Sequence, residues 1–556
     1  MRTSKAWAVT LLAGVAWAMM GSCPAGGAED DWVGYRGPRA SGVFAGSRPP
    51  VDCDMKTGRN IRWRAPLPNW CSGSPIVVKD RVFALSEPGW KHDWPVLTCI
   101  DATNGKVLWE RQVNHLPATG LDPVRQAEIV RQWAAFHDTW RKLYSTFAQT
   151  VGQKKPDEAV ARFEQLGFTF GGHKGGGYGQ LRSLSPKPAD KFGAAAGLHG
   201  ETWHHGCGLG TDCIGMAFAA PVSDGQHVYV TTTFSGAACF DFDGNLRWLK
   251  FVPTTGKTEA YARSPLLWRD LVVSDYFGKL VAFDKATGEV RWIVQTQGGS
   301  IATPAIITVG GKDIVLSEGK QAGGGYLSAT NLADGKPLKI DGWGIGGTQI
   351  MVNTDQPEVA FFCGRGQHSA WSEDEEAPKP PTAVRFALDG QTLKATVLWT
   401  GKDFVGAGGY VGMLYHGGKL YCGTDSTAVV IDAATGKLLA GTMDRTKGRA
   451  GAPRPLPLTR HLLLLAGDRF YGLDGSHRTC DGNFQTSATL SCHALDGKPL
   501  GQSVLLAAPV EGDKLEQIRS QVGWDKWPFS YGLPFTIGGD RIYVRSFDEI
   551  ICIGER

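Results

Sequence analysis

The stretch Leu280 to Trp292, LVAFDKATGEVRW, alternates apolar and polar residues up to Asp284 and resumes the alternation towards Trp292. A period of two residues is typical of half-buried strands, and Thr287-Gly288 between the two runs is a tight-turn signal. The same phrase occurs as LTCIDATNGKVLW, ending at Trp109, and as ACFDFDGNLRW, ending at Trp248. The pattern therefore predicts one strand–turn–strand unit that is used repeatedly.

Weaker copies of the phrase carry their turn glycines at Gly335, Gly390, Gly436 and Gly497. Repeats at intervals of about 40–50 residues are typical of propeller blades with four strands each. One such unit is too small to bury its own apolar face, so neighbouring units must pack on one another. The predicted complete units are 72–113, 218–252, 262–296, 301–340, 347–401, 409–443 and 449–505.

The two ends of the chain supply one further unit. Asn60 to Leu67 is a lone predicted strand that carries Trp63, and Leu533 to Gly554 contains three predicted strands before the chain stops. Joining them would close the ring without leaving a free sheet edge. The predicted fold is all-β: an eight-bladed β-propeller over residues 60–556, preceded by a Gly/Pro-rich lead-in over 29–59.

One long insertion, residues 114–217, interrupts the repeat. Leu121 to Thr150 has apolar residues at helical spacing and a start signal at Asp122-Pro123, which predicts an amphipathic helix. A Gly-rich loop follows. An aromatic stripe on such a helix favours a docking face over a cofactor site, because helices gain most of their stability from burying that stripe.

The long connections are predicted to share one face of the disc. In a blade of four alternating strands, the connections from second to third strand and from fourth strand to the next blade lie on the same face. The predicted long connections are 86–97, 114–217, 364–382, 474–487 and 506–528. Because function usually lies on loops held by a rigid scaffold, this loop-rich face is expected to bind a partner.

The N-terminus predicts export. Arg2 and Lys5 precede the uncharged apolar run Ala6 to Met20, and small residues follow, so residues 1–28 are interpreted as a signal peptide. An alternative is a lipoprotein, since Met20 to Cys23 resembles a lipobox, and only lipidation at Cys23 would attach the protein to a membrane. The periplasm or cell envelope is the expected location. With 58 basic and 54 acidic residues, a nucleic-acid partner is not expected.

Candidate chemistry is concentrated in the insertion. His204, His205 and Cys207 have metal-ligand side chains, but their spacing matches no zinc pattern, so ordinary loop packing is the alternative. Cys207 and Cys213 share one loop and could form a disulfide in an oxidising compartment. Five other cysteines fall in predicted strands, where a thiol behaves as a small apolar group. These are Cys99, Cys239, Cys422, Cys492 and Cys552.

The phrase A-x-D-x-x-T-G-x-x-x-W at Ala282 to Trp292 resembles the tryptophan-docking repeat of pyrroloquinoline-quinone-type propellers. The lead-in, with Trp32, Arg36-Gly37-Pro38 and Gly42, looks like the opening segment of many exported bacterial members. The resemblance implies an eight-bladed fold in which an indole after each turn stacks between neighbouring blades. The tryptophans assigned to this structural role are Trp63, Trp109, Trp248, Trp292 and Trp399.

The family contains quinoprotein alcohol and sugar dehydrogenases, and also non-catalytic members such as the propeller subunit of the outer-membrane β-barrel assembly machinery. The sequence has neither the Cys-Cys pair nor the C-x-x-C-H haem motif of the dehydrogenases. The leading hypothesis is thus a non-catalytic propeller without a cofactor that binds a protein or envelope component. One alternative is a dehydrogenase that uses pyrroloquinoline quinone and Ca²⁺. Another is a carbohydrate- or small-ligand-binding propeller, suggested by Trp90, Trp94, Trp371, Trp524 and Trp527.

Overall fold

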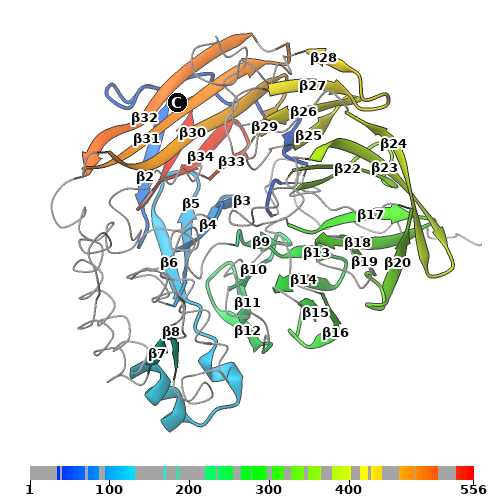
Figure 1. The fold of residues 1–556 in the computed structure, drawn as a ribbon. Coiled ribbons are helices and arrows are strands. Elements are labelled where there is room, and N and C mark those ends of the chain that lie inside the picture. Colours follow the sequence, from blue (N-terminus) through cyan, green and yellow to red (C-terminus); the bar gives the residue numbers. More distant parts are fainter. Residues whose placement is uncertain are drawn as a thin grey trace, which may run out of the picture.

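The structure is a computed structural model of the chain. The residues that it describes are 34–37, 41–68, 73–86, 94–131, 168–170, 184–186, 219–232, 236–253, 264–276, 279–296, 303–318, 327–342, 349–364, 379–401, 413–423, 428–440, 463–480, 483–496, 498–510, 534–546 and 548–555. The described part is almost entirely β-structure, arranged as several antiparallel sheets around a common centre, as in a propeller (Figure 1).

The repeated phrase forms the third and fourth strands of a four-stranded antiparallel sheet. This sheet contains β13 (Leu266–Trp268), β14 (Leu271–Tyr276), β15 (Lys279–Asp284) and β16 (Val290–Gln295), in that order. In the turn before β16, Asp284 accepts hydrogen bonds from the backbone N–H groups of Ala286 and Thr287. Gly288 follows with a φ of 70°, a left-handed conformation that glycine adopts without a Cβ clash.

Three more sheets have the same four-stranded meander. The first contains β3 (Ile76–Val78), β4 (Arg81–Ser86), β5 (Val96–Asp101) and β6 (Val107–Gln112). The second contains β9 (Val222–Ser223), β10 (His227–Thr231), β11 (Gly236–Asp241) and β12 (Leu246–Phe251). The third contains β25 (Met413–His416), β26 (Lys419–Gly423), β27 (Ala428–Asp432) and β28 (Leu438–Ala440).

Two adjacent meanders merge into one sheet of eight strands. They are β17 (Ala305–Val309), β18 (Lys312–Glu318), β19 (Leu327–Asn331) and β20 (Pro337–Asp341), then β21 (Gln349–Val352), β22 (Val359–Gly364), β23 (Lys379–Asp389) and β24 (Thr392–Thr400). The outer strands β20 and β24 pair in parallel, with Lys339 opposite Thr392. The repeat pattern did not predict this joint, because it describes each unit separately.

The two ends of the chain meet in one sheet. β2 (Ile61–Pro66) pairs with β35 (Glu549–Gly554), which continues to β34 (Arg541–Arg545) and β33 (Phe535–Gly538). Trp63 lies opposite Cys552, and Arg64 makes two contacts with the carboxylate of Glu549. The N-terminal strand therefore completes a sheet whose other strands come from the last residues of the chain.

A further large sheet has the longest strands. It contains β29 (Leu463–Ala466), β30 (Arg469–Cys480), β31 (Asn483–Ala494) and β32 (Pro499–Val510), and β1 (Val43–Phe44) pairs in parallel with β29. The prediction of a loop over 474–487 was wrong, because β30 continues to Cys480 and β31 begins at Asn483. The intervening Asp481-Gly482 is a two-residue hairpin signal, and alternating residues flank it.

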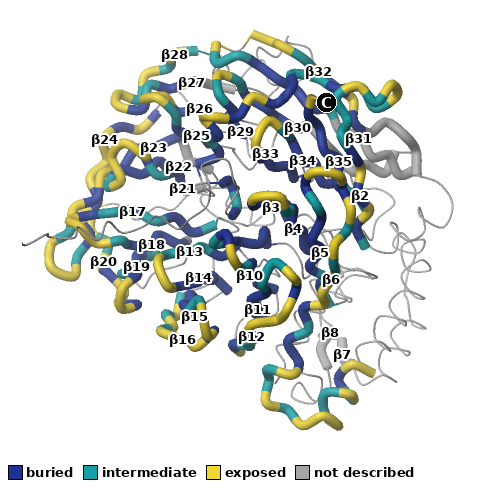
Figure 2. The backbone as a smooth tube through the Cα atoms, turned by 180° about the vertical axis from the view of Figure 1, so that it is seen from behind, coloured by how far each residue is buried: buried dark blue, intermediate teal, exposed yellow. Residues whose placement is uncertain are grey.

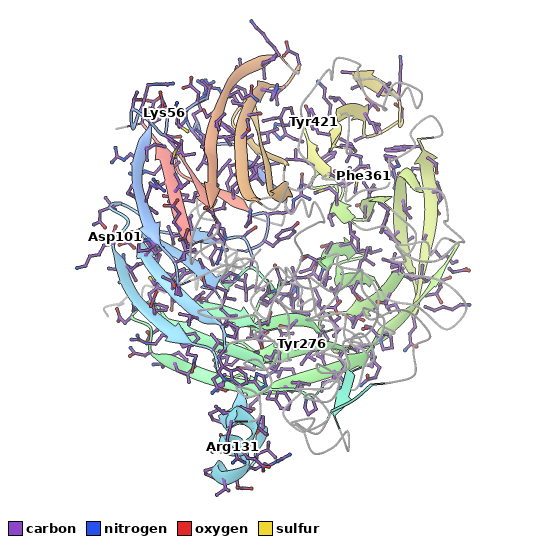
Figure 3. The ribbon with its side chains drawn as sticks, turned by 60° about the vertical axis from the view of Figure 1, so that its left-hand side comes forward. Lys56, Asp101, Arg131, Tyr276, Phe361 and Tyr421 are labelled. Carbon is purple, nitrogen blue, oxygen red and sulfur yellow. The ribbon has the colours of Figure 1, made fainter. Side chains whose placement is uncertain are left out.

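Little of the insertion is described. It contains the 3₁₀ turn η2 (Leu116–Thr119), a helix over 123–131, and the short hairpin of β7 (Phe168–Phe170) and β8 (Leu184–Pro186). The predicted helix over 121–150 is thus present at its start, and its later part lies outside the described residues. Figure 3 places Arg131 of this helix well away from the sheets.

Apolar side chains from facing sheets form the core. Figure 2 shows buried positions along the middle of the strands and exposed positions at the turns and outer edges. The cluster between the β9–β12 and β13–β16 sheets includes Tyr229, Trp248, Tyr276 and Phe283, each at most 6 % exposed. Among the described residues, no helix is long and apolar enough to cross a membrane.

Candidate functional site

Tryptophans on the outer strands join one sheet to the next. The Nε1 of Trp248, on β12, donates a hydrogen bond to the Lys285 carbonyl of the neighbouring sheet at 3.0 Å. Its ring covers Gly288 so closely that a Cβ there would lie 2.6 Å from Cδ2 of the indole. An indole in this position buries a large apolar area and still satisfies its N–H. Trp248 thus links two sheets and requires glycine in the turn that it covers.

The same geometry recurs at the four other repeat tryptophans. They pair as Trp63 with the Ala102 carbonyl and Gly105, Trp109 with the Phe242 carbonyl and Gly244, Trp292 with the Leu332 carbonyl and Gly335, and Trp399 with the Ala433 carbonyl and Gly436. In each pair the tryptophan and the glycine belong to adjacent sheets. In every one of these rings the Nε1–H already donates to a backbone carbonyl.

The residue opposite each of these tryptophans on the third strand is small. The pairs are Cys99 with Trp109, Cys239 with Trp248, Cys552 with Trp63, Ala282 with Trp292 and Ala383 with Trp399. A larger side chain would compete with the indole for space in a close-packed interface. Burial raises the pKa of the Cys99, Cys239 and Cys552 thiols to about 12, so these cysteines are protonated at neutral pH.

The lead-in occupies a junction that has no tryptophan. Four residues after a turn glycine, where other units carry tryptophan, the β32 strand has Gly501, and a Cβ there would lie 2.4 Å from the Val51 carbonyl oxygen. The Cys53 N–H donates to Ser503 Oγ at 2.7 Å, and Tyr471 Oη donates to the Pro49 carbonyl at 2.5 Å. Residues 49–53 thus fill the space beside β32 that an indole fills elsewhere.

The start of the lead-in contacts sheets far apart along the chain. Gly34 approaches Val222 of β9, and Arg36 donates to the carbonyl of Met413, the first residue of β25. Val43 then pairs with Leu465 of β29. Arg36 is 5 % exposed, and burial lowers its pKa from the ordinary value. Residues 34–37 and 41–44 therefore contact the innermost strands of three sheets.

The ends of the second and fourth strands point to one face. Strand β4 ends at Ser86 and β22 at Gly364, and the third strands of the same meanders begin at Val96 and Lys379. Strand β6 ends at Gln112 and β32 at Val510, and the first strands of later sheets begin at Val222 and Phe535. By contrast, the turns between first and second strands are short, as at Gly417-Gly418. In antiparallel meanders these four strand ends have the same direction, and the residues of the connections themselves are largely outside the described part.

His115 anchors the base of the insertion. Its ring stacks on Phe251 with centroids 5.0 Å apart and meets the edge of Trp94 at 5.1 Å. The histidine is fully buried, and the turn η2 that follows contacts β12. Trp94, one of the aromatic residues proposed for a sugar, thus packs against a protein side chain. Sequence reasoning missed His115, which carries no motif and is recognisable only from its spatial neighbours.

Most candidate ligand residues lie outside the described part. This holds for Cys23, His204, His205, Cys207, Cys213, and for the tryptophans Trp90, Trp371, Trp524 and Trp527. Within the described ranges, no group of three His, Cys, Asp or Glu residues is arranged to hold a metal ion. The five cysteines predicted in strands are buried, and so is Cys53 of the lead-in.

Comparison with known proteins identifies the repeat. Residues 39–163 and 200–341 match the family model described as outer membrane protein assembly factor BamB. This part of the chain is thus similar to pyrroloquinoline-quinone-like β-propeller repeats, in agreement with the resemblance noted in the sequence. Among curated proteins, none matches the sequence.

Several solved structures are similar to this chain at low sequence identity. BamB from Moraxella catarrhalis is 13 % identical, with 59 % of this chain and 82 % of that chain covered and a TM-score of 0.33. A europium-containing methanol dehydrogenase is 12 % identical over 93 % and 89 % of the two chains, with a TM-score of 0.38. The quinohemoprotein alcohol dehydrogenase from Comamonas testosteroni is 13 % identical over 95 % and 81 %, with a TM-score of 0.31.

Proposed function

We propose that the protein is an exported, non-catalytic β-propeller that binds a protein or a cell-envelope component through its loop-rich face. The observation that carries this proposal is the one-sided arrangement of the connections. Strands β4, β6, β22 and β32 all end on that face, whereas the opposite face is made of short turns. A rigid scaffold with elaboration on one side is the usual design of a binding platform. The match to a BamB-type family favours a protein partner.

We also infer that the four-stranded units are eight blades of one closed ring. The innermost strands β21, β25, β29, β33 and β3 contact one another in sequence, and β2 completes the sheet of β33–β35. Buried clusters lie between successive sheets along the chain. A ring closed by both ends leaves no sheet without a packing partner on either side.

Site-directed photo-crosslinking in cells of the source bacterium would test the binding proposal. A photoreactive amino acid is placed at exposed positions at the ends of strands on the loop-rich face, namely Gln112, Asp341 and Thr400. Matched positions on the opposite face are Asn104, Asp243 and Thr287. We expect a discrete cross-linked product from the first set alone. Products from the second set, or from neither set, contradict the proposal.

The proposal requires no cofactor, and the rival is a quinoprotein dehydrogenase. Purified protein is titrated with pyrroloquinoline quinone and Ca²⁺ while its melting temperature and the reduction of a dye by alcohols or sugars are measured. A ligand that binds only the folded state raises the melting temperature. An unchanged melting temperature and no dye reduction support a binding role. A higher melting temperature together with dye reduction would show that the protein is an oxidoreductase instead. Sequencing the mature N-terminus tests export and cleavage after residue 28.

A further inference from the structure

Strand β32 is an unusually long outer edge. Outer strands elsewhere in the described part have three to nine residues, whereas β32 has 12 and is the last strand of its sheet. At about 3.4 Å per residue its edge extends for roughly 40 Å. Within the described residues, no strand pairs with β32 on the side away from β31. Figure 1 shows it at the outside of the molecule.

This edge also lacks the features that prevent edge pairing. The sequence of β32, PLGQSVLLAAPV, contains no charged residue. The other outer strands of five or more residues, β2, β6, β12, β16, β20 and β24, each contain at least one. Charged residues on an edge strand are a common protection against pairing with another chain. The two prolines of β32 lie near its ends, at Pro499 and Pro509, and leave the residues between them able to donate.

The two faces of β32 differ in exposure. Gly501 and Ser503 face the lead-in, where Val51 and Cys53 cover them. On the opposite face, Leu500 is 39 % exposed and Val504 is 56 % exposed. Val504 has the highest exposure of any large apolar residue in the blade sheets of the described part. If another strand paired with the edge of β32, its side chains could pack beside Leu500 and Val504 on this exposed face.

We propose that β32 pairs antiparallel with the β32 strand of a second copy of this chain, forming a two-fold symmetric dimer. In a two-fold pair the same charged side chains of both copies come close together when they lie near the axis, and charged residues on an edge disfavour such pairing. Two copies of β32 bring no charged side chains together. Two copies of any other long outer strand would bring charged side chains together. This inference does not depend on the proposed partner of the loop-rich face.

Substitution of Val504 by lysine tests the proposal. The molar mass of the purified full chain is measured by light scattering across a concentration series. We expect a concentration-dependent dimer for the natural chain. Val504→Lys places like charges near the dimer axis and weakens association at least about tenfold. The matched control is Val290→Lys on the outer strand β16, where Val290 is 44 % exposed, and it should dimerise like the natural chain.

A second substitution separates dimer loss from misfolding. Gln502→Lys changes an exposed residue of the same strand, and circular dichroism with a melting curve verifies the fold of every variant. Folded, monomeric Val504→Lys or Gln502→Lys beside a dimeric control supports the proposal. If the natural chain is monomeric at every concentration, the proposal is overturned. This holds also if β32 of that monomer binds an added extended peptide. A dimer that survives both folded variants also overturns it.

Discussion

The tryptophan–glycine pairs are the smallest unit that determines the architecture. The ring of Trp248 packs against the next sheet, and it fits there because Gly288 has no Cβ. Replacing Trp248 by alanine should lower the free energy of unfolding by about 3–5 kcal/mol, because a buried aromatic ring is lost and a cavity remains. Denaturant titration measures the change.

Leu246 provides the control for that substitution. It lies on the same strand and is 52 % exposed, so Leu246→Ala should cost less than about 1 kcal/mol. Equal losses for the two variants would show that Trp248 does not join the sheets in the way described.

The sequence identifies the members of these pairs because the turn glycine and the tryptophan of one unit have a fixed spacing, although each tryptophan covers the glycine of the next unit. A glycine in the turn and an indole four residues later recur at Gly244 and Trp248 and at Gly288 and Trp292, so one repeat identifies the others. The same spacing places Lys339 after Gly335, and there the outer strands pair directly. Backbone pairing between two units leaves no periodic signal, so the sequence gives no indication of this joint.

The cysteines opposite the docking tryptophans should be chemically inert. Burial raises the pKa of Cys99 and Cys239 to about 12, and reactivity requires the thiolate. At pH 8 an alkylating reagent should leave both unmodified in the native protein and modify both in denaturant, as determined by peptide mass spectrometry. Rapid modification of either residue in the native state would contradict the packing at these junctions.

The turn aspartates make folding stability depend on pH. The Thr435 hydroxyl and the N–H groups of Ala434 and Thr435 donate to Asp432, and this holds the carboxyl pKa below its usual value. A carboxyl with a lower pKa in the folded state stabilises the fold above its unfolded pKa of about 3.9 and loses that contribution as the pH falls further.

The substitution Asp432→Asn tests this dependence. It preserves an acceptor oxygen but removes the titration, so its stability should fall less steeply than that of the natural chain below about pH 4. Urea titrations at several pH values measure the slope. Identical slopes for the two proteins would mean that Asp432 contributes nothing to acid unfolding.

At the scale of elements, the lead-in replaces a missing docking residue. Its composition predicts only an irregular segment, because Gly- and Pro-rich stretches have no periodicity. The contact that defines its position is the approach of the Val51 carbonyl to Gly501 of β32. Both partners are unremarkable in the sequence and are more than four hundred residues apart, so local patterns carry no information about the contact.

Gly501→Ala should displace this part of the lead-in. The new Cβ would meet the Val51 carbonyl at 2.4 Å, and overpacking of this kind typically costs about 1–3 kcal/mol. Cys53 is 5 % exposed beside this contact, so its thiol should react faster in the variant while Cys99 stays protected. The control is Gly390→Ala, which strains its own turn because φ is 60° but adds no atom within 4 Å of a neighbour, so Cys53 should stay protected in it. If the reactivity of Cys53 is unchanged in folded Gly501→Ala, residues 49–53 do not pack against β32 as described.

At the scale of the whole molecule, both ends of the chain contribute to one sheet. β35 lies between β34 and β2, and four of its residues, Ile550 to Ile553, are fully buried. Loop-closure entropy opposes this pairing, because the two partners are separated by almost the entire sequence. The cost is offset only when the intervening sheets are already packed, so β2 and β35 are expected to pair late in folding.

A disulfide across this pairing should stabilise more than one within a single hairpin. Pro66 lies opposite Glu549, so Pro66→Cys with Glu549→Cys would close a loop of nearly the whole chain. Lys279 and Gln295 face each other in the β15–β16 hairpin and provide the matched control. The chain-entropy relation gives about 3 kcal/mol for a loop of hairpin size and about 5 kcal/mol or more for the long loop. Melting curves of the oxidised and reduced forms measure both gains. If the long-range bond fails to form while the hairpin bond forms, β2 does not stay paired with β35 in solution, and the closed ring must be abandoned.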